Sequence, residues 1–161
     1  MSPADTGPVD LVVEDSRWEA VGLEDLADRA AVATLTEMGR DPMGHEISLL
    51  ACDDARIRTL NGEFRGKDAE TNVLSWPAFE GDIPRSDPTG LVFLGDIAIS
   101  FDTCEREARD GGKRFEGHVS HLIVHGIMHL LGFDHVEDAE AYEMERIEAN
   151  ILATLDIANP Y

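Results

Sequence analysis

The feature that most constrains this chain is an apolar segment around residue 125 that also carries several histidines. Histidines at positions 118, 121, 125 and 129 would fall within an arc of about 80° on an α-helix. The remaining positions are largely apolar: Leu122, Ile123, Val124, Ile127, Met128, Leu130 and Leu131. An apolar coat of this kind has to be buried against a sheet. The histidine face is therefore predicted to border a cleft.

The spacing of three histidines in this region predicts a metal site. His125 and His129 stand four residues apart, so a helix projects their imidazoles side by side. Gly132 can adopt a left-handed conformation and end the helix, which would let His135 fold back toward the same ion. Three neutral imidazoles leave one open position on a tetrahedral zinc ion, the arrangement of catalytic sites. We predict one Zn2+ per chain, held by His125, His129 and His135.

Neighbouring residues have less definite roles. His118 is expected at the surface, whereas His121, one turn before the first ligand, could contact substrate or support a ligand. Phe133 is expected to anchor the turn after the helix. Asp134 could support the third ligand, or it could serve only as a turn residue.

The metal motif does not match that of the zinc peptidases. Their H-E-x-x-H motif places a glutamate, the base for peptide hydrolysis, directly after the first histidine. Here that position is Gly126, and the segment reads H-G-I-M-H. A metalloprotease-like hydrolase is kept as an alternative.

Hydrophobic periodicity predicts an α/β (α+β) fold. Strands are expected at 11–13, 47–52, 73–76 and 91–100, with Gly95 and Asp96 as candidates for a bulge in the last strand. Helices are expected at 23–38, after the N-cap residue Asp53, and at 105–110, 115–131 and 138–155. Residues 61–72 and 77–90 are polar or rich in glycine and proline, so we expect loops there. The prediction is a single domain over residues 1–161, with a small mixed sheet of about four strands packed against several helices. Residues 1–8 should form a loose arm.

Composition limits the environment and the partners. Thirteen Lys and Arg against 33 Asp and Glu give a net charge of −20, which disfavours nonspecific binding to nucleic acid or to anionic lipid. The longest apolar runs fall short of the ~20 residues that span a bilayer. Cys52 and Cys104 stand apart, as in proteins of a reducing compartment. We expect a cytoplasmic protein without a membrane partner. The cationic stretch 56–67 is where a polyanion would bind, unless it is an ordinary solvated face.

Several blocks of the sequence resemble one known family. The segment HGIMHLLGFDH at 125–135 is similar to the signature of the YbeY family of bacterial endoribonucleases and rRNA maturation factors. Further similarity lies in FRGKD at 64–68, TNVLS at 71–75 and LGDI at 94–97. The resemblance implies a metal-dependent hydrolase that cleaves single-stranded RNA, matures the 3′ end of small-subunit rRNA and acts in ribosome quality control.

The resemblance also implies the site residues. It assigns the zinc ion to the three histidines already named and makes Arg65 the functional arginine. An arginine suits this role because its planar guanidinium binds two phosphate oxygens at once. Asn72 and Asp96 lie in matching blocks, but turn and bulge hydrogen bonding explains them equally well. Whether water or the RNA 2′-hydroxyl attacks stays open.

The net charge of −20 opposes RNA binding and keeps other partners in view. An acidic protein could reach rRNA through ribosomal small-subunit proteins or assembly factors. A noncatalytic ribosome-assembly factor with structural zinc is therefore a second alternative.

Overall fold

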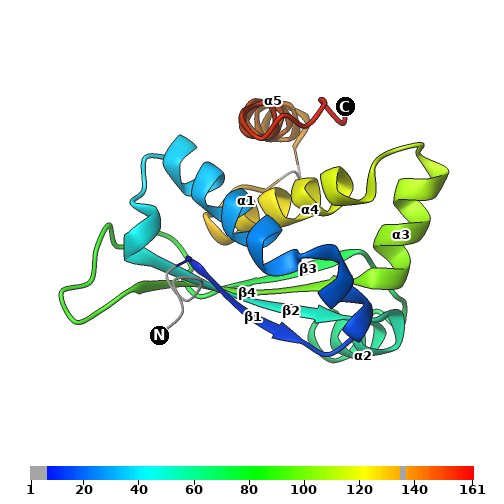
Figure 1. Cartoon of the computed structure of the whole chain (residues 1–161). Coiled ribbons are helices and arrows are strands. Elements are labelled where there is room, and N and C mark those ends of the chain that lie inside the picture. Colours follow the sequence, from blue (N-terminus) through cyan, green and yellow to red (C-terminus); the bar gives the residue numbers. More distant parts are fainter. Residues whose placement is uncertain (1–6, 135–136) are drawn as a thin grey trace.

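The computed structural model describes residues 7–134 and 137–161. A four-stranded mixed sheet forms its centre, as predicted (Figure 1). The strands are β1 (Val9–Val13), β2 (His45–Cys52), β3 (Val73–Pro77) and β4 (Val92–Ser100), in the spatial order β1-β2-β4-β3. The first two strands and β4 run parallel, whereas β3 pairs antiparallel with β4. Strand β3 is therefore an edge strand.

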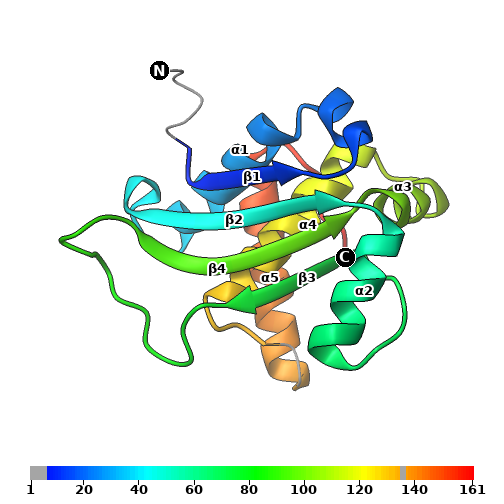
Figure 2. The ribbon, with the colours of Figure 1, turned by 90° about the horizontal axis from the view of Figure 1, so that it is seen from below.

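In the part of the chain that the structure describes, five α-helices lie around the sheet. They are α1 (Leu23–Glu37), α2 (Asp54–Arg65), α3 (Phe101–Asp110), α4 (Phe115–Leu130) and α5 (Asp138–Thr154). Helices α1 and α4 cover one face of the sheet, and α5 lies on the far side of α4 (Figure 1). Helix α2 lies on the opposite face, beside β3 and β4 (Figure 2). Short 3-10 turns span Ser16–Val21 and Pro42–Gly44.

Helix α4 packs closely on the sheet because it carries a glycine at the contact. A Cβ atom at Gly126 would lie 3.1 Å from Ile97 Cδ1 on β4 and 3.2 Å from Ser75 Oγ on β3. The Ser75 hydroxyl also donates a hydrogen bond to the Gly126 carbonyl at 3.4 Å. This face of α4 is buried against the sheet, which leaves the histidines at positions 125 and 129 on the side toward β3's outer edge.

A bulge in β4 lies against the C-terminal end of α4, where a Cβ at Gly95 would come within 2.9 Å of the Leu130 side chain. Glu46 pairs with Phe93 but Ile47 pairs with Gly95, so Leu94 is the extra residue. Gly95 has a φ of +140°, and a Cβ there would collide with the Trp76 carbonyl of β3. The sequence had suggested a bulge at Gly95 and the following residue, and the structure places it one residue earlier.

The predicted loop at 61–72 is wrong over its first five residues, because α2 continues to Arg65. Asn61 is buried within the helix, and its Nδ2 donates to the Ala69 carbonyl at 2.9 Å. Gly66, with a φ of +68°, ends the helix. The predicted start is confirmed, since the Asp53 side chain accepts a hydrogen bond from the Arg56 amide at 2.9 Å.

Helix α3 also begins earlier than predicted, at Phe101 rather than Glu105. Phe101 packs edge-to-face on the fully buried Trp18, with ring centroids 5.1 Å apart. This tertiary contact, which the local sequence does not encode, explains the additional turn.

The described part of the predicted arm joins the fold directly. Residues 1–6 lie outside the described ranges, and the carbonyl of Pro8 accepts a hydrogen bond from the Ile47 amide of β2 at 2.9 Å. Cys52 and Cys104 are buried free thiols. Over residues 7–134 and 137–161, none of the helices has the length and apolar character needed to cross a membrane.

Candidate functional site

A cleft of about 740 Å³ opens at the outer edge of β3. His125 and His129 of α4 line it, together with β3, the end of α2 and the turn after α4. The predicted cleft along the histidine face is thus present. Asp134 is the only acidic residue among the described residues that line it, although the chain carries a net charge of −20.

The orientation of His125 is set by a buried carboxylate on α5. Its Nδ1 lies 2.7 Å from Glu148 Oε2, and Glu148 has no exposed surface. Burial raises the pKa of Glu148, but hydrogen bonds from His121 and His125 outweigh it and lower the pKa to about 2. The carboxylate is therefore ionised and can only accept. Nδ1 of His125 must therefore carry a proton, and in neutral His125 the lone pair is on Nε2.

The orientation of His129 is set by the turn that follows α4. Its Nδ1 lies 2.9 Å from the Phe133 carbonyl oxygen, which can only accept a hydrogen bond. Gly132 has a φ of +99°, and the Phe133 amide donates to the Met128 carbonyl at 3.0 Å. The Phe133 side chain packs against the core, which agrees with the prediction that it anchors the turn. In neutral His129 the lone pair is likewise on Nε2.

The two Nε2 atoms face each other at 3.0 Å. Lone pairs at this separation repel unless a proton or a metal cation lies between them. Two nitrogens bound to one tetrahedral ion at 2.0–2.1 Å are about 3.3 Å apart, so a small opening of the pair accommodates an ion. The donor set of His125 and His129 fits a metal such as zinc.

The third predicted ligand, His135, lies outside the described residues. Within residues 7–134 and 137–161, no group of three or more His, Cys, Asp or Glu side chains could hold a metal ion. The participation of His135 stays a prediction.

Arg65 lies at the same cleft as the two histidines. It is the exposed last residue of α2, not a loop residue as the sequence had suggested. Other cations of the basic stretch pair with carboxylates: Arg56 with Glu14 at 3.3 Å, and Arg58 with Asp68 at 2.7 Å. The positive charge of the stretch is thus partly neutralised at Arg56 and Arg58, on the earlier turns of α2.

The expectation that His118 lies at the surface is wrong. The side chain is only 9% exposed, and its Nε2 lies 2.9 Å from Glu107 Oε1. Asn72 Nδ2 donates to the same oxygen at 3.0 Å, so one carboxylate joins α3, α4 and the start of β3. Asn72 also lines the cleft, but its side chain is bound to Glu107. Asp96 pairs through its backbone with Ser48 of β2 and Trp76 of β3. Both observations agree with the structural interpretation of these two residues.

Comparisons with known proteins identify the family. The model of the family described as "Endoribonuclease YbeY" matches residues 13–156 of this chain. The chain belongs to the YbeY family.

Relatives named endoribonuclease YbeY match nearly the whole chain. One from Ruegeria pomeroyi is 55% identical, covering 95% of this chain and 97% of the relative. One from Dinoroseobacter shibae is 52% identical, covering 95% and 90%. A Thermotoga maritima protein known from a solution structure is 26% identical, with a TM-score of 0.62 over 89% of this chain and 86% of that protein.

Sequence reasoning missed two polar residues of this YbeY site. Glu148 sits among the buried residues of α5, where Met144, Ile151 and Leu152 occupy the neighbouring apolar positions. A glutamate in an apolar helical stripe is the signal that could have identified it, because charged groups are buried only with partners. Tyr161 is the second, and its hydroxyl donates to Glu148 Oε1.

His121 and Tyr161 complete the surroundings of Glu148. His121 Nε2 lies 3.2 Å from Glu148 Oε1 and 2.9 Å from the Tyr161 hydroxyl. Burial and the bond to Glu148 raise the pKa of Tyr161, so its hydroxyl stays protonated. The suggestion that His121 supports a ligand agrees with this geometry, since it shares a carboxylate with His125.

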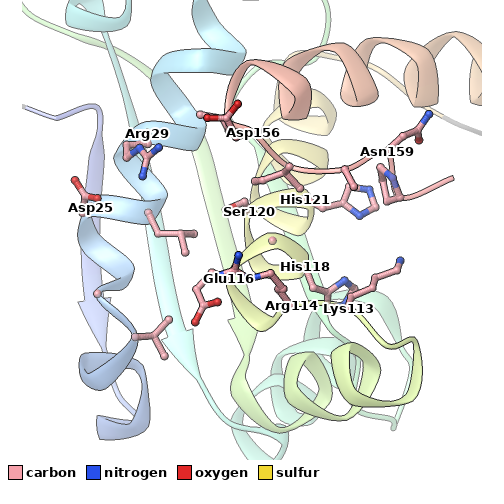
Figure 3. Close-up of a pocket in the computed structure, with 18 of the residues that line it drawn as sticks. Asp25, Arg29, Lys113, Arg114, Glu116, His118, Ser120, His121, Asp156 and Asn159 are labelled. Atoms are coloured by element: carbon pink, nitrogen blue, oxygen red, sulfur yellow. The ribbon is translucent and has the colours of Figure 1, made fainter.

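A second hollow, of about 870 Å³, lies between α1, the start of α4 and the segment after α5 (Figure 3). Its acidic and basic groups balance: Asp25, Glu116 and Asp156 against Arg29, Lys113 and Arg114. Neither His125 nor His129 lines it. The YbeY cleft, with both oriented imidazoles and a single described acid, is the candidate functional site.

Proposed function

We propose that this chain is a zinc-dependent endoribonuclease that cleaves single-stranded RNA. By family resemblance its substrate is rRNA, with a role in maturing the 3′ end of small-subunit rRNA and in ribosome quality control in the cytoplasm. The relatives' names support the RNA-cleaving activity. The observation that carries the metal dependence is the pair of Nε2 atoms facing each other at 3.0 Å across the cleft.

The proposed ligands are His125, His129 and His135. Glu148 holds the proton on Nδ1 of His125, and the Phe133 carbonyl holds it on Nδ1 of His129. Both imidazoles therefore present Nε2 without a change of tautomer. A zinc ion held there would supply Lewis acidity toward water and toward a phosphoryl oxygen.

Arg65 is proposed as the residue that binds the reacting phosphate. Its guanidinium lies at the cleft and can donate two parallel hydrogen bonds to phosphate oxygens, whose negative charge grows during cleavage. The scarcity of acidic side chains in this cleft, in a chain of charge −20, favours a polyanionic substrate at this place. The remaining negative surface suits a protein that reaches rRNA with the help of small-subunit proteins or assembly factors.

An RNA-cleavage assay with metal control tests the proposal. Nuclease-free protein is incubated with a single-stranded RNA and with the same RNA fully paired, before and after chelation and after zinc is restored. We expect cleavage of the single strand that chelation abolishes and zinc restores, and no cleavage by His125→Ala prepared in parallel. Equal cleavage by His125→Ala would refute the proposal, and an inactive but zinc-bound wild type would favour the noncatalytic assembly factor.

A further inference from the structure

The cleft has an aromatic wall, and the metal and phosphate roles leave two of its members, Phe64 and Trp76, unused. Phe64, Trp76, Phe133 and Tyr161 all line it. Phe64 is 62% exposed, although burying a phenylalanine side chain is ordinarily favourable by ~1.5–3 kcal/mol. Phe64 is not a single exposed residue, because it shares the cleft with three other aromatic side chains, and contiguous apolar patches of this kind mark binding sites.

Phe64 and Trp76 form a preformed pair. Phe64 is the next-to-last residue of α2, and Trp76 lies on β3. Their ring centroids are 5.5 Å apart with an interplanar angle of 71°, an edge-to-face arrangement. Trp76 also packs on the buried cluster between α2 and the sheet, so it is half-buried and fixed. The contact therefore orients the exposed Phe64 ring without a ligand, which reduces the ordering cost of binding.

The position of this pair suits one strand of a nucleic acid. Along β3, Ser75 faces α4, whereas Leu74 packs in the cluster on the α2 side together with Trp76. The aromatic pair and the histidines therefore lie on opposite sides of the same edge strand, within one continuous cleft. Arg65 follows Phe64 directly and lines that cleft too.

The chemistry of the wall favours a base over other apolar groups. Aromatic faces beside an arginine are what proteins use to bind single strands, since every unstacked base offers a π-face and every nucleotide a phosphate. A duplex keeps its bases stacked on one another and cannot offer them to Phe64. The pair would thus select for unpaired RNA.

We propose that Phe64 and Trp76 form a stacking subsite for an unpaired base that flanks the phosphate bound by Arg65. The subsite rests on the proposed function, since it assigns part of the same cleft to the same substrate. It explains a preference for single strands by side chains rather than by the metal.

Tryptophan fluorescence offers a direct readout. The chain has two tryptophans, and Trp18 is fully buried, so a ligand in the cleft changes the emission of Trp76. The probe is a 2′-O-methyl single-stranded oligonucleotide, compared with its duplex and with an oligonucleotide of the same length built from abasic nucleotides. Phe64→Leu removes the π-face but keeps apolar volume. Phe93→Leu, at an exposed position on β4 that does not line the cleft, is the matched control.

We expect the single strand to quench Trp76 and the duplex and abasic probes to do so weakly. Phe64→Leu should weaken single-strand binding roughly five- to hundredfold, leave abasic binding unchanged and cleave single strands more slowly at low concentration. Phe93→Leu should behave as the wild type. Wild-type single-strand affinity in Phe64→Leu would overturn the subsite. So would a loss of affinity for the abasic probe as large as the loss for the single strand. Quenching of Trp76 by an apolar peptide instead of the oligonucleotide would also overturn it.

The cleavage assay separates this proposal from the proposed function. A wild type that cleaves RNA while Phe64→Leu binds single strands normally overturns the subsite alone. A wild type that neither cleaves nor binds single strands overturns the proposed function as well.

Discussion

Replacing Glu148 by glutamine should weaken zinc binding although residue 148 is no ligand. The carboxylate has two acceptor oxygens, and both are used: Oε2 faces His125 Nδ1 at 2.7 Å, and Oε1 faces His121 and Tyr161. A glutamine has one acceptor oxygen. If that oxygen faces His125, the amide NH2 faces two groups that donate in the wild type. The substitution also removes the negative charge that makes the imidazole a better ligand.

The expected magnitude follows from this geometry. Loss of such an outer hydrogen-bond partner weakens metal affinity about 10- to 100-fold, which corresponds to ~1.4–2.7 kcal/mol. Zinc stabilises only the folded chain, so the same difference should appear in unfolding at a fixed zinc concentration well above both Kd values. For a chain of this size, the rise in Tm on adding zinc should be smaller in Glu148→Gln by roughly 3–10 °C.

Two measurements and one control make this prediction sharp. Zinc Kd is measured by competition with a chromophoric chelator, and Tm is measured with and without zinc. Glu145→Gln is the matched control, because Glu145 is an exposed glutamate on the same helix and its replacement removes the same formal charge. Identical zinc Kd values for Glu148→Gln and Glu145→Gln would refute the orienting role of the buried carboxylate.

Three further predictions concern other parts of the site. Arg65→Ala should keep wild-type zinc content and Tm, since Arg65 is exposed, but it should cleave RNA about 10²–10³-fold more slowly. Arg65→Lys should recover only part of the rate. A wild-type rate in zinc-replete Arg65→Ala would show that Arg65 takes no part in the reaction. Tyr161→Phe should weaken zinc binding less than Glu148→Gln does, because His121 still bonds to the same carboxylate oxygen. A wild-type zinc Kd for Tyr161→Phe in the chelator competition would exclude a contribution of the hydroxyl. No chelator-sensitive cleavage of an unfolded protein substrate is expected. The position that carries the glutamate base in zinc peptidases is Gly126 here, and it is packed against Ile97 and Ser75. Such cleavage, lost in His125→Ala, would support the peptidase alternative.

Helix α4 and its turn were predictable because local rules and long-range packing agree there. The apolar period, the glycine at 132 and the histidine spacing all indicate one helix ending at the same point, and α4 ends at Leu130. Asp53 was predicted as a helix cap for the same reason, since capping depends on neighbouring residues only.

Other features depend on contacts between distant segments. The last turn of α2 is exposed, and its buried position is taken by the polar Asn61. The side-chain bond of Asn61 to Ala69, which fits this amide into the fold, is not encoded by its neighbours in the sequence. Glu148 lies 23 residues beyond His125, and their contact depends on how α5 packs on α4. The burial of His118 likewise depends on Glu107 of α3. Spacing within one helix cannot encode such pairs.

Metal analysis combined with RNA cleavage tests the central claim most directly. Elemental analysis of protein purified without chelator should give about one zinc per chain for the wild type and for His118→Gln, a histidine on the same helix outside the ligand set. His129→Ala and His135→Ala should lose the zinc, because two imidazoles seldom hold it tightly, and should lose RNA cleavage with it. Full zinc occupancy in either variant, or wild-type cleavage by the zinc-free protein, would contradict a three-histidine catalytic site.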